Sequence, residues 1–198
     1  MIERLTAFSD GVVAIAITLL ALELPVPQGA TNAEVLREIA GHRPEYLTFL
    51  ISFAVVGGQW FSHHRLFAHV ERVDARLTVW NMGWLLTIVV TPFATRMLTA
   101  DGAFEVRFIT YAAVQALCGV FLGQMLGEVA RHKLESRTLR PAGWLAGTGR
   151  RVAVITAGFV VSIPVAFVTH SAYVCWLVVP LVVRALGRLS RLRRRSSP

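Results

Sequence analysis

Charged residues are scarce in this sequence. Only 16% of its 198 residues are Asp, Glu, Lys or Arg, whereas soluble domains contain about 25%. Apolar residues make up 55% of the chain and the mean hydropathy is +0.56. Several apolar stretches reach the roughly twenty residues that a helix needs to cross a bilayer. The composition excludes an ordinary soluble domain and predicts an all-α integral membrane protein.

Cysteine is nearly absent, since the chain contains only Cys118 and Cys175. Both lie within apolar stretches, where we expect small buried hydrophobic side chains rather than a disulfide. We expect no signal peptide, because the first apolar segment lacks a basic region before it and a small-residue cleavage site.

The common catalytic motifs are missing as well. The sequence has no His-Glu-x-x-His, no P-loop, no Gly-rich dinucleotide motif and no serine triad with usable spacing. His63, His64 and His69 lie close together, but no cysteine or carboxylate cluster completes a metal shell around them. We therefore expect no enzyme, no cofactor and no metal site.

Acidic residues are outnumbered, 12 against 20 Lys and Arg, which gives a net charge of +8. Part of the excess lies directly after the last apolar stretch, at Arg191, Arg193, Arg194 and Arg195. This pattern predicts a basic cytoplasmic tail over 188–198 that is attracted to anionic lipid. Nucleic-acid binding is not expected, because it needs aromatic interleaving or a fold signature that the sequence lacks.

Six membrane spans are predicted, and together they form a single domain over residues 1–198. They lie at about 5–24, 44–66, 77–98, 104–129, 152–169 and 171–187. Between the first two, Thr31 with Glu34 three residues later matches a capping box, which predicts a short amphipathic helix over 32–40. Only a few residues separate the last two spans, which indicates a tight helical hairpin.

Lys and Arg are distributed unevenly over the predicted loops. With the N-terminus in the cytoplasm, sixteen of the 20 basic residues lie on the cytoplasmic side. Basic residues are enriched in cytoplasmic loops. We therefore expect a multi-pass protein of the cell membrane with both termini in the cytoplasm.

The first span has two distinct faces. At 100° per residue, Ile15, Leu19 and Leu22 share one apolar stripe with Thr18 beside it. Ser9 and Asp10 lie on a separate polar face near the start of the helix. Periodicity alone leaves open whether the stripe faces lipid, a protein core or a pore.

Residues of this span carry a resemblance to a known family. Arg4, Phe8, Ser9 and Asp10 match the pattern R-x-x-x-F-S-D, and Ala-Ile-Ala-Ile-Thr follows over 14–18. The sequence resembles prokaryotic members of the TMEM175 family of potassium channels. The resemblance implies a homotetrameric cation channel, embedded in the lipid bilayer, that conducts potassium passively and has no Thr-Val-Gly-Tyr-Gly filter.

The same resemblance implies roles for individual residues. Four copies of the first helix would surround the ion path, with Ile15, Leu19 and Leu22 forming an aliphatic constriction. Thr18 would offer a hydroxyl oxygen to the ion, and one such layer implies only weak to moderate potassium selectivity. Glu23 would either concentrate cations at the outer mouth or mark a solvated helix end.

The polar face of the first helix needs partners, because an unpaired carboxylate in the bilayer costs at least about 2.5 kcal/mol. Residues at matching depth predict a polar network between Ser9 or Asp10 and later helices; the candidates are His63, His64, Trp80 and Asn81. We expect Arg4 to pair with Asp10 or with an acid of a neighbouring subunit.

Two other functions remain open at this point. Asp10 and the histidines could act as relays in a proton-conducting or proton-coupled transporter. The chain could also be a membrane scaffold that conducts nothing.

Overall fold

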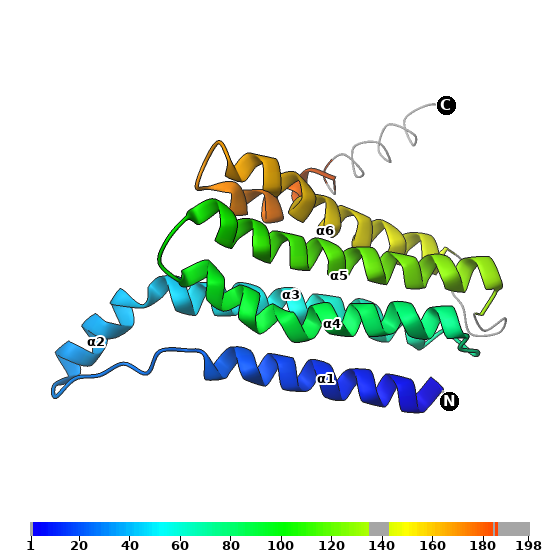
Figure 1. The fold of residues 1–198 in the computed structure, drawn as a ribbon, viewed down its shortest axis with the longest axis horizontal. Helices are drawn as coiled ribbons and strands as arrows, with labels where there is room; N and C mark the ends of the chain where they lie inside the picture. Colours follow the sequence, from blue (N-terminus) through cyan, green and yellow to red (C-terminus); the bar gives the residue numbers. More distant parts are fainter. Residues whose placement is uncertain (1, 135–142, 184, 186–198) are drawn as a thin grey trace, which may run out of the picture.

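The computed structural model describes residues 2–134, 143–183 and 185, and it is helical throughout apart from short connections (Figure 1). The six α-helices are α1 (Ile2–Leu22), α2 (Asn32–Gly41), α3 (Arg43–Phe67), α4 (Ala75–Thr99), α5 (Phe104–His132) and α6 (Trp144–Ala166). A short 3₁₀ helix, η1 (Ala172–Val174), leads into a last helical segment that is described continuously as far as residue 183. The all-α prediction is confirmed.

Four of these helices are long and apolar enough to cross a membrane: α1, α4, α5 and α6. α3 has 25 residues, or about 37 Å of helix, but polar side chains such as Gln59 and His63 lower its apolar character. The apolar helix Ala172–Val183 is shorter. Six spans therefore remain a prediction, and the predicted tail at 188–198 lies outside the described residues.

α6 begins earlier than the hydropathy pattern predicts. We expected this span over 152–169, whereas the helix runs from Trp144 to Ala166. The first two turns contain Gly147, Gly149, Arg150 and Arg151, so they are helical without being apolar. Hydropathy finds the part of a helix that suits lipid and misses polar turns that continue it.

The amphipathic helix between the first two spans is present as α2. Thr31 Oγ1 accepts a hydrogen bond from the Glu34 N–H at 3.3 Å, and Glu34 Oε2 accepts one from the Thr31 N–H at 3.2 Å. This reciprocal pair is the predicted capping box. α2 lies beside the end of the bundle that is farther from the N-terminus (Figure 1).

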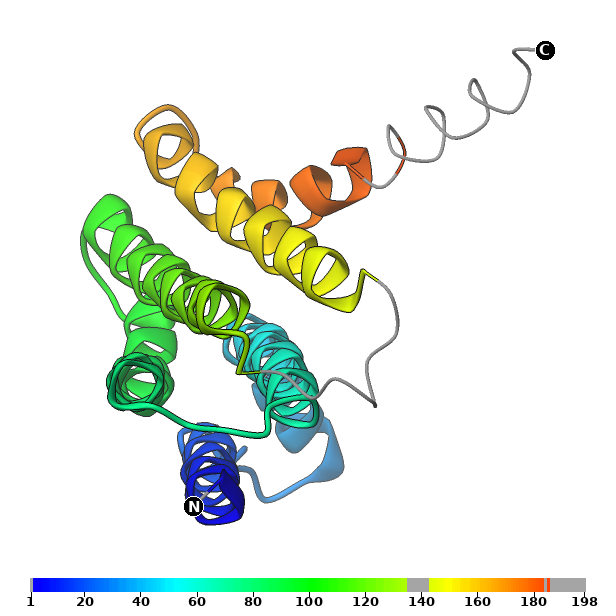
Figure 2. The ribbon, with the colours of Figure 1, turned by 90° about the vertical axis from the view of Figure 1, so that its right-hand side faces the viewer.

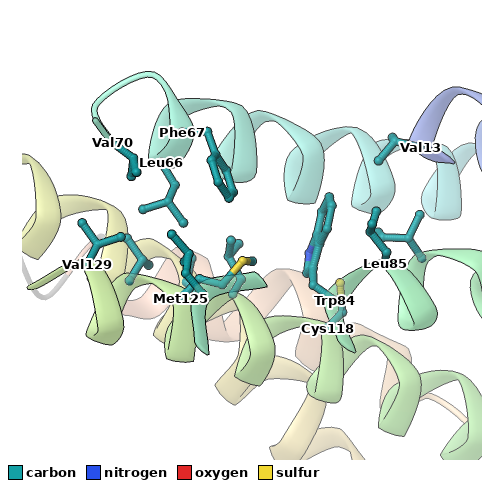
Figure 3. Close-up of a cluster of buried hydrophobic side chains, with 14 of the residues drawn as sticks. Val13, Leu66, Phe67, Val70, Trp84, Leu85, Cys118, Met125 and Val129 are labelled. Carbon is teal, nitrogen blue, oxygen red and sulfur yellow. The ribbon is translucent and has the colours of Figure 1, made fainter. Parts of the chain in front are cut away.

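α4 and α5 pack along much of their length, with α1 and α3 against one side and α6 against the other (Figures 1 and 2). Trp84, Leu66, Met125 and Cys118 belong to the main buried cluster (Figure 3). Cys118 is fully buried and both cysteines are free thiols. Gly119 permits the close approach of α6, because a Cβ at this position would overlap Thr156 Oγ1.

Candidate ion pathway and its polar anchor

One face of α1 packs against the rest of the chain, and the opposite face points away from it. Four residues, at i, i+4, i+7 and i+11, are buried against the other helices: Ser9, Val13, Ala16 and Leu20. The predicted stripe lies on the other side, where Ile15 is 62% exposed, Leu19 42% and Leu22 79%. Within a single chain much of this apolar stripe is left uncovered by the described residues.

Small residues run beside the stripe on the same exposed side of α1: Ala7, Gly11, Ala14, Thr18 and Ala21. A Cβ added at Gly11 would meet nothing within 4 Å. Thr18 Oγ1 donates to the Ile15 carbonyl at 2.7 Å. Because its single proton is used within the helix, the oxygen keeps its lone pairs for an outside donor or a cation.

The ends of α1 differ in how their charges are paired. Glu23 Oε2 lies 3.1 Å from Arg96 Nη1 of α4, and both side chains remain exposed. This pairing was not predicted, and it reduces the negative charge that Glu23 offers at its end of the helix. Arg4 is exposed, and among the described residues no carboxylate lies within 4.0 Å of it.

A buried chain of hydrogen bonds links three helices at the polar face. Asn81 Nδ2 of α4 donates to Ser9 Oγ of α1 at 3.1 Å, and Ser9 Oγ donates to the Leu5 carbonyl at 2.8 Å. His63 Nε2 of α3 lies 2.7 Å from Asn81 Oδ1. Ser9, Asn81 and His63 are each 0% exposed. The donor directions are consistent along the chain when His63 carries its proton on Nε2.

The ring of Trp84 holds His63, the histidine of the hydrogen-bond chain, in place. His63 is stacked on Trp84, with ring centroids 4.2 Å apart and planes at 9°. The ring of Phe67 lies 4.6 Å away on α3. His63 therefore has one hydrogen-bonded edge and packed faces, which fixes its orientation.

Asp10 finds a different partner from those expected. Trp60 Nε1 of α3 donates to Asp10 Oδ1 at 2.8 Å. Asp10 lies about 100° around α1 from Ser9, so the two side chains meet different positions on the neighbouring helices. Trp60 is one turn before His64, and their ring centroids are 5.5 Å apart.

Two of the expected partners therefore lie outside the hydrogen-bond chain. Trp80 packs against Phe121 of α5, with centroids 6.2 Å apart. His64 is exposed, and its ring contacts Trp60, the donor to Asp10. Trp60 was missed, although its position four residues before His64 could have identified it as part of the same helix face.

The two faces of α1 are thus chemically separate. The anchor, which consists of Ser9, Asp10, Trp60, His63 and Asn81, fixes the rotation of α1 against α3 and α4. Each buried hydrogen bond contributes about 0.5–1.5 kcal/mol net. The rotation set by the anchor leaves the stripe of Ile15, Leu19 and Leu22 facing outward.

Comparison with known proteins finds relatives of this chain. The sequence profile of the family described as "Endosomal/lysosomal potassium channel TMEM175" matches residues 4–92, which include the anchor and the stripe. A protein of Streptomyces collinus named as a potassium channel is 31% identical over 94% of this chain and 88% of its own length. The human endosomal/lysosomal proton channel TMEM175 is 31% identical over 73% of this chain, but the match spans only 31% of the human protein.

A solved structure shares the fold. The crystal structure of a homologue of the lysosomal potassium-selective channel TMEM175 from Chamaesiphon minutus superposes with a TM-score of 0.74 and 27% sequence identity. The alignment covers 92% of this chain and 97% of that one. With a matching family profile, a relative similar along nearly its whole length and the same fold, this chain belongs to the TMEM175 family.

Proposed function

We propose that this chain assembles as a homotetramer that conducts potassium passively, with four copies of α1 around the ion path. The main support is the orientation of α1: its polar anchor faces the rest of the chain, and its aliphatic stripe faces outward. The bacterial relative and the superposed structure are both named as potassium channels. The small residues beside the stripe favour close packing of copies of α1.

The proposed topology has six spans in the cell membrane and both termini in the cytoplasm. Four helices satisfy length and composition, and α3 is long enough to be the fifth. The sixth would begin near residue 171 and continue beyond the described segment. The Lys and Arg distribution supports this orientation.

Ile15, Leu19 and Leu22 form the constriction in this proposal, and hydrophobic constrictions control conduction through dewetting. Thr18 supplies one layer of four hydroxyl oxygens. A filter that selects strongly stacks several layers of carbonyls, so preference for potassium over sodium is weak to moderate. Glu23 contributes less to cation attraction than a free carboxylate, because Arg96 pairs with it.

Proton conduction is the second candidate, since the human relative is named as a proton channel. The chain of Asn81, His63 and Ser9 supplies hydrogen-bonded groups. However, it ends on the Leu5 carbonyl, which does not carry protons, and it lies on the side of α1 opposite the stripe. A membrane scaffold without conduction is the remaining alternative.

One recording separates these functions. The purified chain is reconstituted in planar bilayers with potassium on one side and sodium on the other, at equal pH. A potassium channel shifts the reversal potential toward the potassium equilibrium value. A proton channel instead follows an imposed pH difference and ignores the exchange of potassium for sodium, and a scaffold gives no current.

A further inference from the structure

Three side chains with metal-binding atoms meet where α4 begins and α5 ends. Asp74 is the N-cap of α4, and Glu128 and His132 lie one turn apart at the end of α5. One ligand atom from each residue lies within 4.8 Å of the other two. The loop before α4 is held against the end of α5, because the Glu71 N–H donates to the Leu134 carbonyl at 2.9 Å.

Glu128 is unusual for an acidic residue, since its side chain is only 2% exposed. Its Oε1 atom is buried and accepts no hydrogen bond from the part of the chain that the structure describes. His132 Nε2 lies 3.1 Å from Oε1, but without the alignment of a hydrogen bond. Arg131 approaches the other oxygen, with Nη1 3.8 Å from Oε2. A buried carboxylate oxygen without a donor is costly and requires an explanation.

A shared cation accounts for this geometry. Two tetrahedral ligands at about 2.1 Å from Zn²⁺ are roughly 3.4 Å apart, close to the 3.1 Å that separates Glu128 Oε1 and His132 Nε2. Asp74 Oδ1 accepts from the Leu77 N–H at 2.7 Å, which leaves its second oxygen as a ligand. One imidazole and two carboxylates suit Zn²⁺ and similar transition metals better than Ca²⁺ or Mg²⁺.

The cluster is open to solvent on one side. The side chain of His132 is 48% exposed. A cavity of about 300 Å³ lies beside Glu128 and is also lined by Trp80, Arg76 and Arg131. An ion can therefore reach the buried carboxylate without unfolding of the bundle.

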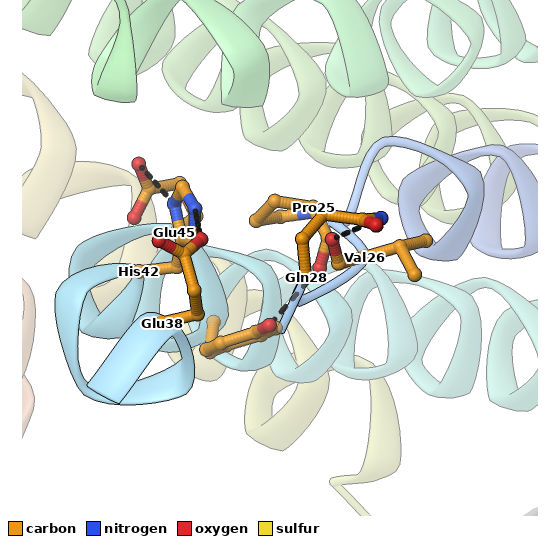
Figure 4. A network of polar contacts seen from close by, with 7 residues as sticks. Pro25, Val26, Gln28, Glu38, His42 and Glu45 are labelled. Atoms are coloured by element: carbon orange, nitrogen blue, oxygen red, sulfur yellow. Dashed lines mark hydrogen bonds and ion pairs between the residues drawn. The ribbon is translucent and has the colours of Figure 1, made fainter. Parts of the chain in front are cut away.

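A second histidine of the chain contacts two carboxylates and provides a contrast (Figure 4). His42 Nε2 lies 3.5 Å from Glu38 Oε2, and His42 Nδ1 lies 3.5 Å from Glu45 Oε1. The two acids approach different ring nitrogens, so one ion cannot bind both carboxylates and the same nitrogen. His42 therefore has two carboxylate neighbours, as His132 does, but their ligand atoms do not converge on one point.

We propose that Asp74, Glu128 and His132 bind one divalent transition-metal ion, for which Zn²⁺ fits best, and that the ion links the start of α4 to the end of α5. This site is independent of the ion path. The metal would stabilise the end of the bundle at which α1 also begins (Figure 1).

The test uses the full chain in detergent, without a polyhistidine tag and freed of metal by a chelator. Co²⁺ is titrated while its visible absorption is recorded, and Zn²⁺ is then added as competitor. We expect one Co²⁺ per chain and its displacement by Zn²⁺. Asp74→Asn keeps a residue that caps helices but removes the charge, and His132→Asn removes the imidazole. Each should raise the Kd at least as much as loss of an outer-shell group does, about 10–100-fold.

His42→Asn is the matched control and should leave the Kd and stoichiometry unchanged. Zn²⁺ should also raise the melting temperature of the parent chain and fail to raise that of His132→Asn. Because the His132 side chain is 48% exposed, His132→Asn remains informative even if substitutions of the buried Glu128 prevent folding. Absence of one specific Co²⁺ equivalent, equal binding by His132→Asn and the parent, or equal loss in His42→Asn would each overturn the proposal.

Discussion

α1 and α4 are both apolar helices, but they use their apolar surface differently. In the most apolar stretch of α4, 50% of the residues are buried within the chain, whereas in α1 the share is 22%. The same contrast exists between the two faces of α1. One face carries Ser9 and packs against α3 and α4, and the other carries Ile15 and is largely exposed.

This difference shows that hydropathy and burial are separate properties in a membrane protein. α4 packs against three other helices, which cover half of its most apolar stretch. α1 has apolar surface beyond what the chain covers, so that surface must meet lipid or further copies of the chain. The polar anchor determines which residues of α1 are buried and which face outward, because it fixes the rotation of the helix.

The largest expected effect comes from removing the centre of the anchor. Asn81→Ala deletes the group that joins Ser9 to His63, so buried His63 Nε2 loses its partner and Ser9 Oγ loses its donor, keeping only its bond to the Leu5 carbonyl. We expect a loss of about 3 kcal/mol and a melting temperature lower by about 6–12 °C, measured by thermal unfolding in detergent. Met82→Ala, at the next and exposed position, is the control and should have little effect. An Asn81→Ala protein as stable as its control would show that the anchor does not hold α1.

A smaller loss is expected at the aromatic contact with the carboxylate. Trp60→Phe keeps an aromatic ring, although a smaller one, and removes the N–H that donates to Asp10 Oδ1, so we expect a loss of about 1–2 kcal/mol. Trp80→Phe is the matched control, because its ring packs on Phe121 instead. Equal melting temperatures for the two variants would assign no role to the Trp60 hydrogen bond.

The smallest effect is expected on the exposed face. Thr18→Ala removes the hydroxyl without changing the buried contacts of α1, so stability stays constant while the potassium-to-sodium permeability ratio moves closer to one. Thr18→Ser keeps the hydroxyl and should largely retain the ratio. Bi-ionic reversal potentials measure both variants. An unchanged ratio in Thr18→Ala, or a parent ratio in the hundreds, would place selectivity elsewhere.

The anchor illustrates what a single sequence can predict. Ser9, His63 and Asn81 could be named because polar residues at one depth of apolar helices have few alternative partners. Trp60 shares a helix face with His64, but which of these side chains donates to Asp10 depends on the rotation of α3 relative to α1, which periodicity does not fix. The Glu23–Arg96 pair and the Asp74, Glu128 and His132 cluster join helices that are distant in sequence. Local patterns contain no information about such pairs.

Helix boundaries show the same limit. The capping box of Thr31 and Glu34 was predictable because it is a local hydrogen-bond pattern. The start of α6 at Trp144 was not, because Gly147 and Gly149 weaken both helix propensity and hydropathy over the first two turns. The first turn is nevertheless packed, because Trp144 and Leu145 contact the main buried cluster.

The central claim is that the exposed face of α1 surrounds the ion path, and a ring of engineered thiols tests it most directly. Ile15→Cys places four thiols around the axis if the claim is correct, and soft thiolates in such a ring bind Cd²⁺ tightly. Leu86→Cys on α4 is the matched control, because Leu86 is 64% exposed in the single chain but belongs to another helix. The account predicts that micromolar Cd²⁺ blocks the potassium current of Ile15→Cys and leaves Leu86→Cys equal to the parent. A conducting Ile15→Cys channel that responds to Cd²⁺ no more than the parent does would contradict it.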